Sequence, residues 1–371
     1  MPENFLGRKW QRKQKKFMKI ALVYDRVNKW GGAERVLLTL QKIFPEATLY
    51  TSVYNAKKAS WAKNFKIIPS FLQKFPLSSH HELFASLMPV AFESFSFDEF
   101  DLVISITSEA AKGILTKPTT KHICICLTPT RYLWSGYNDY FKNPILRFFA
   151  APITSYLQTW DKIASQRPDY YIAISKEVQN RIKKYYHRES TVIYPAVELT
   201  DTKIVKENKG YFLVVSRISK FTQYKKIDLA VKAATKLSLP LIVVGDGNTN
   251  KLKRIAGPTV SFVGKVTDAQ LATYYANCRA LVFPGIEDFG LVMVEAQAFG
   301  KPVIAFKAGG ALEIIEQGKT GTFFESQTVD ALAHVLANFN ENVYNNKACR
   351  ENALRFSFET FKKQLLEAIK K

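Results

Sequence analysis

Hydrophobic and polar positions along the chain form blocks that predict strands followed by helices. Segment 31–44 carries apolar residues such as Val36, Leu37 and Leu40 at helical spacing, which is typical of a helix with one buried face. A helix is also expected after Ser175, because serine favours the position just before a helix. Apolar runs of strand length lie between these helices, at 19–25, 101–106, 122–127 and 170–175.

A second series of strand and helix patterns begins near residue 210. Its apolar runs lie at 211–215, 240–245, 260–263, 280–284 and 302–306. The stretch 195–209 between the two series is polar and lacks periodicity, which indicates a linker. Alternating buried strands and helices form doubly wound sheets. We therefore predict an α/β fold with two Rossmann-like doubly wound domains that face each other across a cleft.

The domain boundaries follow from the same patterns. We expect a basic leader at 1–17, a first domain at 18–195, a linker at 196–209, a second domain at 210–350 and a C-terminal helix within 351–371. The leader is expected to be either disordered or a short amphipathic segment, unless the chain starts at Met18. The C-terminal helix has no strand after it, so we expect it to pack back toward the first domain.

Composition adds a strong charge to this picture. The 371 residues include 53 lysines and arginines against 32 acidic residues, a formal net charge of +21. Such an excess indicates an anionic partner, which could be a nucleic acid, a membrane surface or a phosphorylated substrate. No apolar run approaches the ~20 residues of a membrane span, and the first 19 residues lack the apolar core of a secretory signal. A cytoplasmic location is therefore expected.

Two kinds of site are not expected. The basic residues are spread along the chain without a recognition-helix or RNA-binding motif, so nucleic acid is only a minor alternative partner. Four cysteines and five histidines show no metal-like spacing, so no metal site is predicted. The cysteines are Cys124, Cys126, Cys278 and Cys349.

Glycines that follow two of the predicted strands could form a phosphate-binding site. Gly245 and Gly247 begin a dinucleotide-like fingerprint, but Asn250 stands where its third glycine belongs, so an ordinary turn is favoured there. Gly31 and Gly32 lie between a strand and a helix, where backbone amides could approach a phosphate. A tight turn is the alternative for this pair.

Basic residues stand at the start of the second domain, where its first strand gives way to a helix. Arg217 follows the strand, and Lys225 and Lys226 precede the helix. In a doubly wound sheet both positions reach the edge of the sheet where ligands bind, so they could neutralise a diphosphate. A solvated basic loop is the alternative.

Segment 284–306 places two carboxylates around the start of a predicted helix. The amides of Phe289, Gly290 and Leu291 lie at that start and could receive a phosphate. Glu295 falls within the helix, where its carboxylate could accept hydrogen bonds from both hydroxyls of a ribose. Glu287 precedes the helix and would reach the group beyond the phosphates. This pattern predicts a site for a nucleotide sugar.

From Met18 to near its end, the chain resembles the family 4 retaining glycosyltransferases of GT-B fold. The resemblance rests on "GGAERV", "LMPVAFESFSFDEFDLVIS", "AAKGI", "LTPTRYLW", "VIYPAVE", "FVGKVTD" and "PGIEDFGLVMVEA". The middle stretches most resemble GDP-mannose-dependent mannosyltransferases of bacterial surface-polysaccharide assembly. The matches at "LTPTRYLW" and "LMPVAFES" argue against the main alternative, another GT-B enzyme such as a sugar-nucleotide epimerase.

The resemblance implies a role for each matching position. The glycine loop near the diphosphate and acceptor falls on Gly31 and Gly32, and the residues that bind the distal phosphate fall on Arg217 and Lys225. Glu287 would hold hydroxyls of the donor sugar, and Glu295 the ribose. The pocket for the base falls on Gly264, Lys265 and Val266. The catalytic residues are then expected to be Glu287, Arg217 and Lys225, with no metal and no cofactor besides the donor.

The chain departs from the family pattern at two points. Lys225 follows Arg217 by eight positions, an interval longer than usual in the family, so Lys220 or Lys226 could take the lysine's role. Leu127 stands where relatives often carry a histidine that contacts the donor sugar. Arg131 and Asp25 are the nearest polar replacements by motif.

The resemblance and the charge together imply the partners. We expect a hexosyltransferase that uses a nucleotide sugar and a lipid-linked glycan acceptor. Such an enzyme would associate peripherally with the inner face of the cell membrane, an anionic surface that +21 favours. The basic leader is expected to supply most of this contact, and the aromatic stretch 137–160 either adds to it or forms a buried helix pair.

Overall fold

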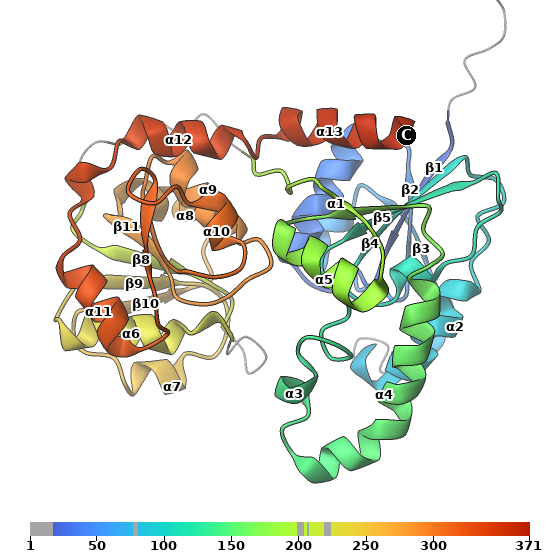
Figure 1. The fold of residues 1–371 in the computed structure, drawn as a ribbon, viewed down its shortest axis with the longest axis horizontal. Helices are drawn as coiled ribbons and strands as arrows, with labels where there is room; N and C mark the ends of the chain where they lie inside the picture. Colours follow the sequence, from blue (N-terminus) through green and yellow to red (C-terminus); the bar gives the residue numbers. More distant parts are fainter. Residues whose placement is uncertain (1–17, 77–80, 199–203, 206–207, 219–223) are drawn as a thin grey trace, which may run out of the picture. The chain divides into compact units, whose positions relative to one another are not determined.

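A computed structural model describes residues 18–76, 81–198, 204–205, 208–218 and 224–371 (Figure 1). The basic leader, part of the predicted linker and Lys220 lie outside these residues. Contacts between residues divide the chain into two compact units, Met1–Ile172 and Ala173–Lys371. Among the described residues, no helix is both long and apolar enough to cross a bilayer.

The first sheet has seven strands in the order β3-β2-β1-β4-β5-β6-β7. They are β1 (Ile20–Tyr24), β2 (Thr48–Thr51), β3 (Lys66–Pro69), β4 (Leu102–Thr107), β5 (Lys121–Cys126), β6 (Tyr170–Ala173) and β7 (Thr191–Val192). Strand β1 pairs in parallel with both β2 and β4. The chain order reverses between β1 and β4, and ligands of doubly wound sheets bind at such a reversal.

Five α-helices lie along this part of the described chain. They are α1 (Gly32–Ile43), α2 (Met88–Glu93), α3 (Tyr137–Tyr140), α4 (Pro144–Ala164) and α5 (Lys176–Tyr186), with short 3-10 turns at Ser60–Ala62, Phe71–Lys74, His81–Leu87 and Ala111–Gly113. Val36, Leu37 and Leu40 of α1 are buried. The predicted cap of α5 is confirmed, because the Ser175 hydroxyl accepts a hydrogen bond from the Val178 amide at 3.1 Å.

The second sheet has six parallel strands in the order β10-β9-β8-β11-β12-β13. They are β8 (Phe212–Val215), β9 (Leu241–Val244), β10 (Val260–Gly264), β11 (Ala280–Phe283), β12 (Val303–Phe306) and β13 (Gly321–Phe324). Here the order reverses between β8 and β11. The strands are almost entirely apolar because both faces of a doubly wound sheet are covered.

The remaining helices follow strands of the second sheet or end the chain. They are α6 (Ile227–Lys236), α7 (Asn250–Lys253), α8 (Asp268–Asn277), α9 (Leu291–Ala298), α10 (Ala311–Ile314), α11 (Val329–Ala337), α12 (Asn346–Leu354) and α13 (Phe358–Lys370), with a 3-10 turn at Glu341–Val343. A core of β8, β9, α6 and α11 side chains holds this unit together. The packing of α13 against the first domain stays a prediction.

The two doubly wound sheets confirm the predicted fold class, although four strands were not predicted. Strands β2, β3, β7 and β13 contain only two to four residues each. Polar residues, a proline or a glycine interrupt them, so no apolar run marks them in the sequence. Their pairing partners in the sheet, rather than their own pattern, make them strands.

Candidate active site

The second unit has a pocket at the point where the strand order reverses. Residues from the carboxyl ends of β8 and β11 line it, together with the start of α6. The polar or charged lining residues are Ser216, Lys225 and Glu287. Parallel strands all point their carboxyl ends to one edge of the sheet, so the fold itself gathers residues that are distant in sequence.

Two predicted residues, Lys225 and Glu287, form an ion pair in this pocket. The Lys225 Nζ lies 2.7 Å from Glu287 Oε1, and the side chains are only 18% and 23% exposed. Gly285 lets the two loops approach, because a Cβ at this position would lie 2.5 Å from the Lys225 Cα. The pair thus places one positive and one negative group side by side where a ligand would enter.

Arg217 lies on the loop after β8, and its side chain is exposed. The turn after β9 supports this loop, since the Ile218 amide donates to the Asp246 carbonyl at 2.8 Å. Cβ atoms at Gly245 and Gly247 would lie 1.7 and 1.8 Å from backbone carbonyl oxygens of that loop. These glycines therefore make the predicted close turn, and they hold in place the segment that carries Arg217.

The start of α9 presents the predicted backbone amides. Gly290 has a φ of 98°, and a Cβ there would lie 2.4 Å from the Met293 side chain, so glycine is required. Among the described residues, no carbonyl or side chain accepts a hydrogen bond from the amides of Phe289, Gly290 or Leu291. The Phe289 ring itself is buried and stacks on Tyr194, so its side chain serves packing.

A glycine pair after β12, which was not predicted as part of the site, holds the same loop from the other side. The Gly310 amide donates to the Glu287 carbonyl at 3.0 Å. A Cβ at Gly310 would lie 2.1 Å from the Phe289 carbonyl oxygen, and one at Gly309 would lie 2.6 Å from that of Glu287. Two adjacent glycines shortly after the predicted strand 302–306 were the available signal.

Glu295 lies within α9 and is 9% exposed. Its Oε2 accepts a hydrogen bond from the Tyr275 hydroxyl of α8 at 2.7 Å. The Tyr275 ring stacks on Phe299 with centroids 5.6 Å apart. Tyr275 therefore fixes the orientation of the carboxylate predicted to bind ribose. No sequence pattern marked Tyr275, because the contact arises only when α8 and α9 pack together.

The predicted base pocket lies at the end of β10, the edge strand of the second sheet. Gly264 has a φ of 71°, and a Cβ there would have no heavy atom within 4 Å. Its carbonyl accepts a hydrogen bond from the Gly245 amide at 2.9 Å. Lys265 is exposed and Val266 is half-buried, so this short turn offers both a charged and an apolar surface.

In the first unit, Gly31 and Gly32 lie at the start of α1, as predicted. A Cβ at Gly31 would lie 3.2 Å from an oxygen of Glu34. That carboxylate is buried and accepts a hydrogen bond from the Tyr24 hydroxyl at 2.6 Å. The glycine turn is thus packed tightly over a buried polar pair at the end of β1.

Asp25 follows β1, and its carboxylate is committed to the fold. It accepts hydrogen bonds from the Thr107 hydroxyl at 2.9 Å and the amides of Ser108, Ala110 and Ala111 at 2.7–3.0 Å. Four such bonds occupy a carboxylate's acceptor sites, so Asp25 is not a candidate to hold a donor sugar. Leu127 is buried at the end of β5.

The described residues contain no group of three or more metal-ligating side chains arranged to hold a metal ion. Lys225 lines the candidate pocket, Arg217 directly follows Ser216 of its lining, and the amides at the start of α9 come shortly after Glu287 in the chain. Cations and a helix start of this kind suit a phosphate group.

Comparison with known proteins agrees with this geometry. The family model described as "Glycosyl transferases group 1" matches residues 198–356. An uncharacterized glycosyltransferase of Methanocaldococcus jannaschii is 27% identical over 202 residues, which cover 53% of this chain and 56% of the relative. A GDP-mannose-dependent alpha-mannosyltransferase of Mycolicibacterium smegmatis is 32% identical over 130 residues, 33% of this chain and 35% of the relative.

Solved structures resemble the chain over nearly its whole length. A sucrose-phosphate synthase of Thermosynechococcus elongatus has a TM-score of 0.73 at 16% identity, covering 95% of this chain and 98% of its own. Anabaena HepE in complex with UDP-glucose has a TM-score of 0.69 at 21% identity, covering 95% and 99%. In contrast, the chain spans about half the length of the curated relatives it matches, or less. Residues 198–356 thus match the family model of the group 1 glycosyl transferases, and the two doubly wound units of the chain have the GT-B fold.

Proposed function

We propose that this protein is a retaining glycosyltransferase that transfers a hexose from a nucleotide sugar to a lipid-linked or polysaccharide acceptor. One observation carries the proposal: Lys225 and Glu287 lie side by side in a pocket at the reversal point of the second sheet. A cation there suits the diphosphate of a donor, and a carboxylate suits the hydroxyls of its sugar.

The diphosphate would be held without a metal ion. Arg217 and Lys225 supply two positive charges, and the amides of Phe289, Gly290 and Leu291 supply donors at the start of a helix. These groups would stabilise the negative charge that develops on the leaving diphosphate, which is usually the largest contribution of a protein to such a step.

The two carboxylates would bind the two sugar units of the donor, its ribose and its hexose. Glu295, oriented by Tyr275, would accept hydrogen bonds from the ribose hydroxyls. Glu287 would accept hydrogen bonds from hydroxyls of the hexose, on the far side of the diphosphate. The short turn at Gly264, Lys265 and Val266 would contact the base.

The chemical step would proceed on the face of the sugar that the leaving group departs from. The bond between the anomeric carbon and the diphosphate oxygen breaks, and the sugar gains oxocarbenium character. The acceptor hydroxyl oxygen then bonds to the anomeric carbon, and its proton passes to the departing diphosphate. Attack from the departing face retains the anomeric configuration.

GDP-mannose is the donor we favour. A relative 32% identical to part of the chain is a GDP-mannose-dependent mannosyltransferase, and an O-antigen chain mannosyltransferase of Escherichia coli is 26% identical over 245 residues. The structural resemblance to a UDP-glucose complex makes UDP-glucose the donor to compare with it. A lipid-linked acceptor implies peripheral contact with the inner face of the cell membrane.

A donor panel tests the proposal. The purified full chain is incubated with GDP-mannose, UDP-glucose and other nucleotide sugars, and the release of free nucleotide and hexose is measured by mass spectrometry. We expect slow hydrolysis of GDP-mannose, which Lys225→Ala suppresses by about 100-fold or more. If the protein neither bound nor hydrolysed any nucleotide sugar, the proposal would be contradicted. A preference for UDP-glucose would show that UDP-glucose, and not GDP-mannose, is the donor.

A further inference from the structure

Helix α4 of the first unit exposes a row of large apolar side chains. Phe148 and Phe149 are 75% and 72% exposed and Ile145 is 67% exposed, the highest values of any large hydrophobic side chain among the described residues. Ile153 and Tyr156 continue the row at 51% and 48%. Spacings of three, four and seven residues place all five on one face of the helix. We call these five residues the α4 apolar row.

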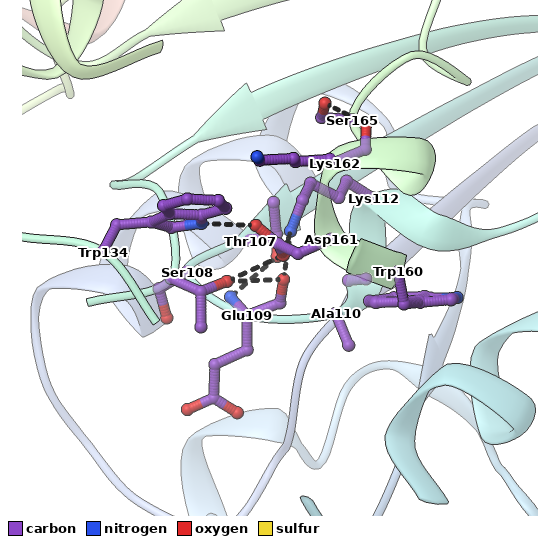
Figure 2. Close-up of polar contacts among 12 residues, drawn as sticks. Thr107, Ser108, Glu109, Ala110, Lys112, Trp134, Trp160, Asp161, Lys162 and Ser165 are labelled. Atoms are coloured by element: carbon purple, nitrogen blue, oxygen red, sulfur yellow. Dashed lines mark hydrogen bonds and ion pairs between the residues drawn. The ribbon is translucent and has the colours of Figure 1, made fainter. Parts of the chain in front are cut away.

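The opposite face of α4 is anchored to its own unit. Asp161 of α4 and Lys112 form an almost fully buried ion pair at 2.5 Å (Figure 2). The Asp161 carboxylate also accepts hydrogen bonds from the Thr130 hydroxyl at 3.0 Å and the Trp134 indole at 2.8 Å. Breaking a buried ion pair is strongly unfavourable, so α4 cannot rotate to bury the apolar row in its own unit.

The charges around the row favour an anionic partner. Between residues 140 and 160 the sequence contains Lys142 and Arg147 but no aspartate or glutamate. Both basic side chains are exposed. In Figure 1 the amino-terminal part of α4 extends away from the sheet of the first unit.

An exposed apolar face that is flanked by cations fits the interface of an anionic bilayer. A helix of this kind lies in the plane of the membrane, with its apolar face buried about 5–10 Å among headgroups and acyl chains. Helix α4 has 21 residues and does not qualify as a membrane span, which agrees with a position on the surface. A protein partner would not require the lack of acidic residues along the row.

We propose that α4 is an interfacial membrane helix whose apolar row inserts among the lipids of an anionic bilayer. Membrane contact would then depend on a folded element of the first unit, and not on the basic leader alone. This membrane proposal rests on the proposed function in one respect: a lipid-linked acceptor would explain why the protein needs to bind a membrane. The binding itself is measured without a donor or an acceptor.

Vesicle flotation tests the proposal with the full chain. Vesicles of phosphatidylcholine alone are compared with vesicles that also contain phosphatidylglycerol. We expect binding to the anionic vesicles, and at least about tenfold weaker binding for the double variant Phe148→Ser/Phe149→Ser, because two aromatic rings no longer leave water. Deletion of residues 1–17 should weaken binding less than this double variant does.

A matched variant controls for the loss of exposed apolar surface. Val343 and Leu354 of the second unit are 64% and 51% exposed, and Val343→Ser/Leu354→Ser should bind anionic vesicles as the wild type does. Both double variants should keep the melting temperature, since the substituted side chains are exposed. Equal vesicle binding by wild type and Phe148→Ser/Phe149→Ser would overturn the proposal.

The depth to which α4 inserts into the bilayer and the self-association of the protein can be measured as well. In Phe148→Trp, an additional tryptophan signal should shift to shorter wavelength and be quenched by lipid-attached quenchers when anionic vesicles are added. Sedimentation velocity should show the same species for wild type and the Phe148→Ser/Phe149→Ser variant. A wild-type dimer that this variant dissociates would assign the row to a second copy of the chain and overturn the membrane proposal.

A failure of the proposed function can be distinguished from a failure of the membrane proposal. Hydrolysis of a nucleotide sugar in the absence of vesicles does not involve α4, so it should be equal in wild type and in Phe148→Ser/Phe149→Ser. Vesicle binding without any hydrolysis would contradict the proposed function and leave the role of α4 intact. Hydrolysis without vesicle binding would contradict the membrane role of α4 and leave the proposed function intact.

Discussion

The ammonium group of Lys225 lies 2.7 Å from the carboxylate of Glu287, although three strands separate these residues along the chain. Each partner keeps the other in the pocket before a ligand arrives. The ion pair also means that the charge of Lys225 is partly balanced, so the diphosphate of the proposed donor would have to compete with Glu287 for it. Removing one partner should therefore change the binding of nucleotides in a direction that the geometry predicts.

Glu287→Ala should reduce turnover by about 100-fold or more, because the sugar loses an acceptor for its hydroxyls. It should leave the affinity for free GDP equal or slightly higher, since Lys225 no longer pairs with a carboxylate. Calorimetric titration with GDP and a turnover assay measure the two effects. Weakened GDP binding in Glu287→Ala would contradict the assignment to the sugar.

Glu295→Ala should weaken the binding of GDP itself, by roughly 1–3 kcal/mol for a charged acceptor lost from the ribose. Tyr275→Phe is the matched control, because it keeps the carboxylate and removes only the hydroxyl that orients it. Its effect should be smaller and in the same direction. If GDP bound to Glu295→Ala as tightly as to the wild type, the ribose would be held elsewhere.

Arg217→Ala should cut turnover by about 100-fold while the fold persists, because under the proposed function its exposed guanidinium would stabilise the leaving diphosphate. Lys226→Ala is the control. Lys226 is exposed next to Lys225, so it shares the local charge but not the pocket. Normal turnover in Lys225→Ala beside an inactive Lys226→Ala or Lys220→Ala would show that another lysine serves the phosphate.

Gly310→Ala should disturb the loop that carries Glu287 and the helix-start amides. Its new Cβ would lie 2.1 Å from the Phe289 carbonyl oxygen, and such overpacking costs about 1–3 kcal/mol. Gly318→Ala is the control, because it adds a Cβ with nothing within 4 Å at a φ of 75°. Gly310→Ala should lower both the melting temperature and the affinity for GDP. Gly318→Ala should lower the melting temperature alone. Unchanged GDP binding in Gly310→Ala would separate this turn from the site.

Acid should destabilise the first unit through His122. Burial, with a smaller contribution from the charge of Arg167, lowers the pKa of His122 from 6.5 to about 3. Its Nε2 lies 2.8 Å from the Ser105 hydroxyl. The unfolded chain binds a proton there below pH 6.5 and the folded chain does not, so stability present above this pH is lost as pH falls toward 3.

Urea unfolding at two pH values measures this effect. Between about pH 7 and pH 5, the free energy of unfolding of His122→Gln should fall by about 2 kcal/mol less than that of the wild type. His334→Gln is the control, because His334 is an exposed residue of α11. An equal pH dependence in wild type and His122→Gln would mean that the folded chain protonates His122.

The sequence determined the class of the fold and most of the candidate site. Short apolar runs such as 280–284 became buried strands, because strands covered on both faces are almost continuously apolar. The positions of Glu287, Gly290 and Glu295 around a helix start could be predicted from local order, since a strand, a loop and a helix start follow one another directly in the chain. Local patterns suffice wherever the parts of a site are neighbours in sequence.

Tertiary structure decided what depends on contacts between distant segments. The pairing of Lys225 with Glu287 and of Tyr275 with Glu295 follows from the strand order and from the packing of α8 on α9, neither of which leaves a trace in local periodicity. The commitment of Asp25 to four hydrogen bonds withdrew it as a candidate for sugar binding. Helix α4 is the clearest case: its aromatic pattern fitted a buried helix pair as well as an exposed face. The buried ion pair between Lys112 and Asp161, which fixes the helix's rotation, selects the exposed face.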